Sequence, residues 1–209
     1  MIKEKKILCL SPHPDDVEFG CGGSLNRWVK YNEIIYVAFS PCNKSLPSGF
    51  AKNSIYEECD LSTKSMGLKR ENVLKFQFPV RDFPEHRQEI LEEMVKLNKS
   101  YSPDIVLMPN ALDIHQDHHQ IHLAGKRAFK NASILGYELP WNNFATQANF
   151  FVKLDEVDVL QKLKSIACYQ SQKNRIYASE ENIKSALIFR GMQAKTRYAE
   201  CFEVIRWLI

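Results

Sequence analysis

Short apolar runs alternate with longer segments of helical character along almost the whole chain. Strands are predicted at Lys6–Leu10, Glu33–Phe39, Val73–Phe78, Asp104–Met108, Ile134–Leu139, Asn149–Lys153 and Cys201–Leu208. Helices are predicted at Gly23–Tyr31, Ile55–Met66, Pro84–Ser100, Asp117–Lys130, Leu154–Cys168 and Ser179–Arg190. Because strands alternate with helices, the pattern indicates βαβ units and a mostly parallel sheet.

The predicted fold class is therefore α/β, as a single Rossmann-like three-layer domain that spans residues 1–209. A chain of this length can bury one sizeable core. The stretch Ser40–Asn53 contains Pro41, Pro47 and Gly49 and is predicted to be a long loop. Such a loop is either a lid over a functional site or a disordered insertion, and the sequence leaves both interpretations open.

A histidine and two carboxylates follow the first predicted strand, in the segment His13-Pro14-Asp15-Asp16. Ligands of open α/β sheets bind beyond the carboxyl ends of the strands. Imidazole nitrogens and carboxylate oxygens are common ligands of zinc and similar divalent ions. The alternative is an ordinary turn, because the segment is rich in turn-forming residues.

A second polar cluster favours the metal-site interpretation. Four of the six histidines of the chain lie between Asp113 and His122, directly after the strand predicted at Asp104–Met108. Loops that follow parallel strands meet at one edge of the sheet, and a catalytic divalent metal needs about three protein ligands and an open position. We therefore expect a metal site at the carboxyl edge of the strands.

These residues also resemble the signatures of a known family. The segment Pro12–Glu18 with Gly22-Gly23, and the later His115-Gln116-Asp117-His118, are similar to the two metal motifs of the PIG-L/LmbE-like zinc-dependent deacetylases, which include the N-acetylglucosaminyl-phosphatidylinositol deacetylases. Further similarity lies at Tyr169–Gln172, Arg190-Gly191 and Tyr198–Phe202. The resemblance implies hydrolysis of the N-acetyl group of an amino sugar or sugar conjugate, which releases acetate and a free amine.

Spacing and the family pattern together assign His13, Asp16 and His118 as metal ligands. The expected ion is Zn²⁺, and Fe²⁺ or another divalent ion would suit the same donors. His13 and Asp16 are three residues apart in a turn, so both side chains can face one ion. His118 and His122 could instead chelate a metal from one face of a helix, but no Glu follows His118 as in H-E-x-x-H.

The remaining polar residues of the two loops are assigned to proton transfer and charge stabilisation. Asp15 is the expected general base, and a protonated His115 is expected to stabilise the oxyanion or donate a proton to the leaving amine. Asp117 is expected to orient His115 and keep it charged, or to cap the following helix, and the two roles are compatible.

Arg81 is a candidate substrate contact, because it follows the strand predicted to end at Phe78 and a guanidinium can hold an anionic or hydroxyl-rich group. The alternative for this region is a surface salt bridge in which Arg87 pairs with Glu85 or Glu89.

Two other function classes stay open. A phosphoesterase with two metals is one, because Glu18, Asp113 and Asp117 are further carboxylates. The other is a non-catalytic domain that binds a metal or a sugar. Asp15 and His115 argue against it, because a binding module needs neither a general base nor an oxyanion donor.

Charge and composition restrict the partners. A net charge of +3 and the absence of a long basic block do not favour nucleic acid. No apolar run approaches the ~18 residues of a transmembrane helix, and no signal peptide precedes the first strand, so a cytoplasmic location is expected. The expected partner is a small N-acetylated sugar or sugar conjugate.

Overall fold

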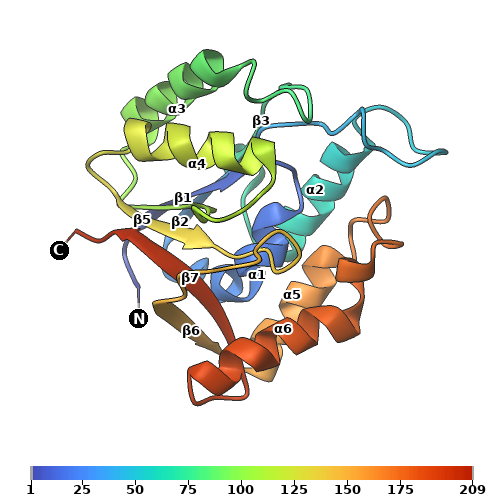
Figure 1. The fold of residues 1–209 in the computed structure, drawn as a ribbon, viewed down its shortest axis with the longest axis vertical. Helices are drawn as coiled ribbons and strands as arrows, with labels where there is room; N and C mark the ends of the chain where they lie inside the picture. The colour runs from blue at the N-terminus through green and yellow to red at the C-terminus, as the bar shows by residue number, and fades with distance from the viewer. Residues whose placement is uncertain (1, 209) are drawn as a thin grey trace.

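The computed structural model describes residues 2–208, which form one seven-stranded sheet with helices on both faces (Figure 1). The strands are β1 Lys6–Ser11, β2 Glu33–Ala38, β3 Val73–Lys75, β4 Ile105–Pro109, β5 Ser133–Tyr137, β6 Phe150–Leu154 and β7 Tyr198–Arg206. The helices are α1 Asp16–Trp28, α2 Ser54–Ser65, α3 Arg87–Tyr101, α4 Gln116–Ala128, α5 Glu156–Ile166 and α6 Glu180–Gln193, with short 3₁₀ turns at Arg70–Asn72 (η1) and Ile176–Ala178 (η2).

The sheet order is β3-β2-β1-β4-β5-β7-β6. Strands β1 to β5 pair in parallel, and β7 runs antiparallel to both of its neighbours, β5 and β6. This order confirms the predicted α/β class with a mostly parallel sheet.

Side chains of each strand alternate between two hydrophobic cores, as the period of two residues in a strand requires. On β1, Ile7 and Cys9 pack into the core beneath α1, α2, α5 and α6, whereas Leu8 and Leu10 pack into the core beneath α3 and α4. Figure 1 shows α3 and α4 on one side of the sheet and the other four helices on the opposite side. The molecule therefore has the three layers that the sequence predicts.

The chain changes direction across the sheet between β1 and β4, which are hydrogen-bonded neighbours. Strand β1 continues into α1 on one face, and β4 leads to α4 on the other face. The two connecting loops diverge at the carboxyl ends of these strands, and that point is where ligands bind in open α/β sheets.

Helix α1 begins at Asp16, seven residues earlier than the sequence predicts, so Asp16 lies in the first helical turn and not in a loop. Helical geometry is interrupted at Cys21 (φ −148°, ψ 21°). Beyond this kink, the N–H groups of Gly23 and Ser24 donate to the Glu200 carboxylate of β7 at 2.9 and 2.6 Å. A Cβ on Gly23 would approach a Leu154 methyl carbon to 2.6 Å, so the close contact requires glycine.

The Glu200 carboxylate also accepts a hydrogen bond from Lys162 Nζ of α5 at 2.6 Å, and both residues are buried. One carboxylate thus joins α1, α5 and β7.

Two other elements differ from their predicted bounds. Strand β3 ends at Lys75, three residues before Phe78, and helix α3 begins at Arg87, three residues after Pro84. Within residues 2–208, no helix combines the length and the apolar character needed to span a bilayer.

We expect Glu200→Ala to lower the free energy of unfolding by about 3–5 kcal/mol, because it leaves the Lys162 ammonium buried without its partner and uncaps the kinked α1. Urea denaturation measures the change. The double variant Glu200→Gln/Lys162→Met should recover part of the loss. Glu33→Ala, which removes an exposed pair with Lys6, is the control and should cost at most about 1 kcal/mol. An equally small cost for Glu200→Ala would contradict the assigned role.

Candidate active site

The loops after β1 and β4 bring three side-chain atoms to one point. The Nδ1 atom of His13 lies 3.1 Å from Nε2 of His118 and 3.3 Å from Oδ2 of Asp16. The third side of this triangle, from His118 Nε2 to Asp16 Oδ2, measures 3.2 Å. His13 follows β1, Asp16 begins α1, and His118 lies in the first turn of α4. We call these three residues the His–Asp cluster.

The His–Asp cluster fits a divalent cation. Ligand atoms about 2.0–2.1 Å from a tetrahedral zinc ion lie about 3.3 Å from one another, close to the three separations of the cluster. Two imidazoles and a carboxylate also match the ligand preferences of Zn²⁺ and Fe²⁺. His13, His115 and His118 form a wider set, whose nitrogen atoms lie within 4.8 Å of one another. Asp16 completes a tighter site than His115 does.

Each imidazole of the cluster is oriented by a buried carboxylate. Nε2 of His13 donates to Oδ2 of Asp117 at 3.0 Å, and Nδ1 of His118 donates to Oδ2 of Asp113 at 2.8 Å. These bonds leave His13 Nδ1 and His118 Nε2, the two nitrogens of the cluster, to face a cation. Carboxylates that hold metal-binding histidines in this way also raise the basicity of the ligand.

The structure corrects the role that the sequence suggested for Asp117. Its carboxylate makes no hydrogen bond to His115 among the described residues; it accepts hydrogen bonds from His13 and from the backbone N–H groups of Arg81 (2.7 Å) and Phe83 (3.3 Å). Its side chain does not cap α4 either. The cap residue is His115, whose Nδ1 accepts the Asp117 N–H at 3.1 Å.

This cap determines the chemistry available to His115. Burial and the neighbouring imidazoles of His118 and His13 lower the pKa of His115 to about 4, so its ring is neutral near pH 7. Since Nδ1 accepts a backbone N–H, the ring proton lies on Nε2. His115 can therefore donate a hydrogen bond as a neutral imidazole, and it need not carry the positive charge that the sequence analysis expected.

The electrostatics of the cluster favour positive charge between its members. Burial lowers the pKa of His13 and of His118, but the Asp16 carboxylate and the hydrogen-bonded Asp117 and Asp113 outweigh it, and the two pKa values rise to about 9 and 10. Protonated imidazoles or a divalent cation would each supply the charge that these carboxylates favour.

Asp15 directly precedes α1 and lines the cavity beside the His–Asp cluster. Burial and the adjacent Asp16 carboxylate raise the pKa of Asp15 to about 7. A carboxylate whose pKa lies near neutral pH is suited to accepting and returning a proton. Asp15 and Asp16 are therefore adjacent in sequence but occupy different electrostatic environments.

Glu18 stabilises the loop between β1 and α1. Its fully buried carboxylate accepts hydrogen bonds from the hydroxyls of Tyr36 (2.8 Å), Ser62 (2.6 Å) and Tyr169 (2.7 Å). Both tyrosine hydroxyls also contact the carbonyl oxygen of Pro14, between His13 and Asp15. Strand β2, helix α2 and the segment after α5 thus fix the loop, a role for Glu18 that sequence reasoning missed.

A cavity of about 280 Å³ opens beside the cluster, and Arg81 is among its lining residues; its role as a substrate contact stays a prediction. Cys42 and Ser45 of the 40–53 loop also line this cavity, so the loop borders the site; whether it acts as a lid stays a prediction. Sequence reasoning missed further polar and aromatic lining residues, although Gln172 lies in a noted motif; among them are Trp141, Gln172, Arg175 and Tyr177.

His122 lies outside the cluster, which argues against the helical His118–His122 chelate. Its Nδ1 bonds to the carbonyl oxygen of Pro109 at 3.0 Å, and the residue is buried between α4 and β4. Its Nε2 has no hydrogen-bond partner among the described residues.

The fold and the His–Asp cluster define a class of protein: a three-layer α/β protein with a candidate divalent-cation site at the switch point of its sheet. The sequence model of the PIG-L family, described as GlcNAc-PI de-N-acetylase, matches residues 8–129, more than half of the chain. The chain belongs to the PIG-L family.

Individual relatives agree with this assignment. An uncharacterized deacetylase of Escherichia coli, YaiS, is 31% identical over an alignment of 161 positions, which covers 72% of this chain and 84% of that protein. Diacetylchitobiose deacetylase of Thermococcus kodakarensis is 24% identical over an alignment of 222 positions, which covers 94% of this chain and 81% of that protein. A structure of N,N'-diacetylchitobiose deacetylase from Pyrococcus horikoshii superposes with a TM-score of 0.80 at 22% identity, covering 96% of this chain and 84% of that chain, and shows the shared fold.

We expect Asp16→Ala and His118→Ala to lose most bound metal, because a catalytic site has only about three protein ligands. Asp113→Asn should weaken metal affinity by only about 10–100-fold, because Asp113 orients His118 without being a ligand. Metal analysis of the purified proteins and competition with a chromophoric chelator measure both effects. His119→Ala, an exposed histidine next to His118, is the matched control. Full metal occupancy in Asp16→Ala would refute the assigned ligand set.

Proposed function

We propose that this chain is a metal-dependent N-deacetylase, carried by a single domain, that hydrolyses the N-acetyl group of an amino sugar or sugar conjugate. One observation carries the metal-dependent part: His13 Nδ1, His118 Nε2 and Asp16 Oδ2 lie 3.1–3.3 Å from one another. Membership of the PIG-L family and similarity to deacetylases of N-acetylated sugars support the choice of substrate.

His13, Asp16 and His118 would hold the cation, with Zn²⁺ the proposed ion and Fe²⁺ an alternative for the same donors. The bound cation would supply Lewis acidity, which lowers the pKa of a water molecule and polarises the amide carbonyl. Asp113 and Asp117 keep the two imidazoles in the tautomers that present a lone pair to the cation.

Two other residues of the cavity handle protons and charge. Asp15 accepts a proton from the attacking water and can return it to the departing amine, so that water and amide become acetate and free amine. His115 donates a hydrogen bond from Nε2 to the carbonyl oxygen as negative charge develops there. Asp117 acts on catalysis through His13, which it orients, and is a positioning residue.

The contacts of Glu18, Asp113 and Asp117, the carboxylates that could have held a second metal, argue against a phosphoesterase with two metals. Glu18 is enclosed by three hydroxyl groups, and Asp113 and Asp117 each accept a hydrogen bond from an imidazole of the cluster. None of them is available as a ligand for a second ion. A non-catalytic role would leave the separate environments of Asp15 and His115 unexplained.

Arg81 and Arg175 extend the site towards the substrate. Both line the cavity, and neither guanidinium has a hydrogen-bond or ion-pair partner within residues 2–208. The Arg81 backbone is in the left-handed region (φ 72°), and its N–H bonds to Asp117, which ties this arginine to the second loop. We propose that Arg81 contacts a hydroxyl-rich or anionic part of the substrate, with Arg175 as a second contact.

The proposed activity is tested by acetate release from free, nucleotide-linked and lipid-linked N-acetylglucosamine. We expect release from at least one class, loss of activity after chelation and recovery when Zn²⁺ or Fe²⁺ is restored. Asp15→Asn should keep its metal while kcat falls by roughly 10²–10⁴-fold, because the base is lost and the ligands remain. His115→Ala should keep its metal and lose roughly 10²–10³-fold in kcat.

His119→Ala, on the exposed face of α4, is the control and should retain full activity. Loss of metal from Asp15→Asn would show that Asp15 is a metal ligand, and the roles assigned to Asp15 and Asp16 would then have to be exchanged. Full activity in both Asp15→Asn and His115→Ala would refute the hydrolytic mechanism.

Arg81→Ala should raise KM for the true substrate more than it lowers kcat, because the proposed contact is remote from the reacting amide. Steady-state kinetics over a range of substrate concentrations separate the two constants. Arg87→Ala, at the start of α3 and outside the cavity lining, is the control. Unchanged KM and kcat in Arg81→Ala would remove Arg81 from the substrate site.

A further inference from the structure

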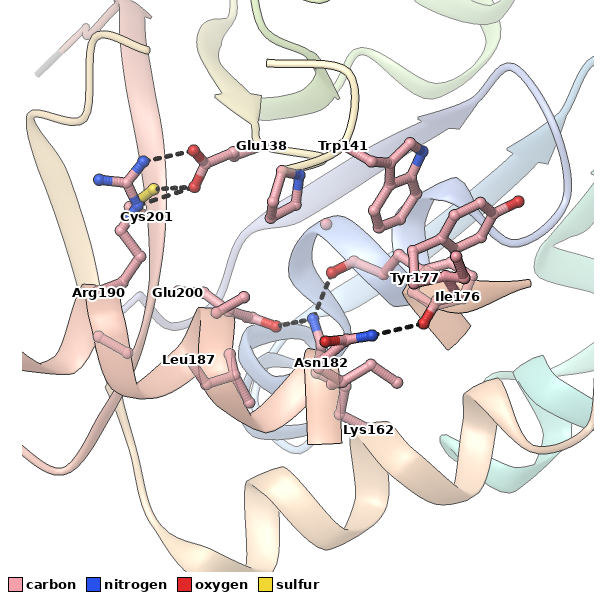
Figure 2. A pocket seen from close by; sticks show the side chains of 16 residues that line it. Glu138, Trp141, Lys162, Ile176, Tyr177, Asn182, Leu187, Arg190, Glu200 and Cys201 are labelled. Carbon is pink, nitrogen blue, oxygen red and sulfur yellow. Dashed lines mark hydrogen bonds and ion pairs between the residues drawn. The ribbon is translucent and has the colours of Figure 1, made fainter. Parts of the chain in front are cut away.

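A second cavity, of about 480 Å³, lies next to the candidate active site (Figure 2). It is lined by the first half of α1, the segment after β5, helix α5, the turn η2, helix α6 and strand β7. Most of its lining is apolar, with Phe19, Pro140, Ile183, Ala186, Leu187 and Ala199 among the contributors. We call this cavity the apolar pocket.

The charged groups of the apolar pocket are already paired within the protein. Lys162 Nζ bonds to Glu200 at 2.6 Å, and Arg190 Nε bonds to Glu138 at 2.9 Å. The Cys201 thiol also donates to Glu138, at 3.0 Å, and Figure 2 shows Arg190, Cys201 and Glu138 together, apart from the Lys162–Glu200 pair. Because the pairs neutralise one another, the described lining has no free charge for an ionic ligand. A neutral, apolar group suits this environment.

Two aromatic rings separate the apolar pocket from the His–Asp cluster. Trp141 and Tyr177 stack with ring centroids 4.0 Å apart and planes inclined by 13°. Both residues line the apolar pocket and also the 280 Å³ cavity that contains His115 and Asp15. At the rim, the side chain of Ile176 is 84% exposed, although it is apolar. The two cavities therefore share this aromatic wall, and the apolar pocket lies directly beside the cavity of the cluster.

We propose that the apolar pocket binds a neutral alkyl or aryl aglycone of the N-acetylated amino-sugar substrate. This inference rests on the proposed deacetylase function and narrows its substrate class to sugars that carry an apolar substituent. The volume of the pocket lies in the range of small-molecule sites, which are mostly apolar. Arg81 and Arg175 line only the neighbouring cavity, so polar and apolar parts of one substrate would bind in separate places.

The test is a series of β-glycosides of N-acetylglucosamine with methyl, butyl and octyl groups. In the wild type, KM should fall by about two- to fourfold for each methylene that the apolar pocket buries. Ala186→Phe adds bulk to the lining of the pocket, so the ratio of the methyl to the octyl KM should approach about 1. The ratio of the methyl to the octyl KM is measured within one variant, so a general loss of activity in that variant does not change the ratio.

Ile188→Phe is the matched control, because Ile188 lies on the same helix but is exposed and outside the lining. It should keep the wild-type ratio. An equal KM for methyl and octyl glycosides in the wild type would overturn the proposal, and so would an unchanged ratio in Ala186→Phe.

A binding measurement separates this proposal from the proposed activity. Octyl β-D-glucopyranoside has no acetamido group, and calorimetry below its critical micelle concentration should show binding that Ala186→Phe weakens at least about tenfold. If no glycoside releases acetate but this binding and its loss are observed, the apolar ligand site stands and the deacetylase function fails. If acetate is released but octyl glucoside does not bind, the apolar pocket is refuted and the activity stands.

Discussion

The pairing of β1 with β4 is the constraint on which the candidate site depends. These strands are parallel neighbours, yet β1 leads to α1 on one face of the sheet and β4 leads to α4 on the other. Their loops cannot close over one another, so a crevice opens at the carboxyl edge. His13 and His118 are 105 positions apart in sequence and meet there with nitrogen atoms at 3.1 Å.

Buried carboxylates hold most of the side chains around that crevice in place, and each makes a different set of contacts. Asp16 faces both imidazoles, Asp113 and Asp117 hold the outer nitrogens of the rings, and Glu18 fixes the loop through hydroxyl groups. Glu200 caps the second half of α1 from β7. Because an unpaired buried charge is costly, these contacts restrict each side chain to one position.

Much of the fold was predictable because its signals are local. Each of the seven strands and six helices of residues 2–208 overlaps a segment that apolar runs or helical spacing predict, and the polar loops follow β1 and β4 as expected. The start of α1 was not predictable, because the glycines that suggested a turn lie within a helix whose kink is capped by Glu200, 177 positions after Gly23. The contacts of Asp117 were missed for the same reason: its nearest partners come from other loops.

The sequence by itself determined the α/β class, the two loops and the types of residue that meet in them, since periodicity and motif spacing are properties of the chain. The tertiary structure alone decided which atoms converge: that the Asp117 carboxylate bonds to His13 rather than His115, that His115 Nδ1 accepts a backbone N–H and that Glu18 supports the loop. It alone revealed the apolar pocket, whose walls come from α1, α6 and β7. Side-chain partners, tautomers and cavities depend on distances between segments remote in sequence, and these distances exist only after the layers pack.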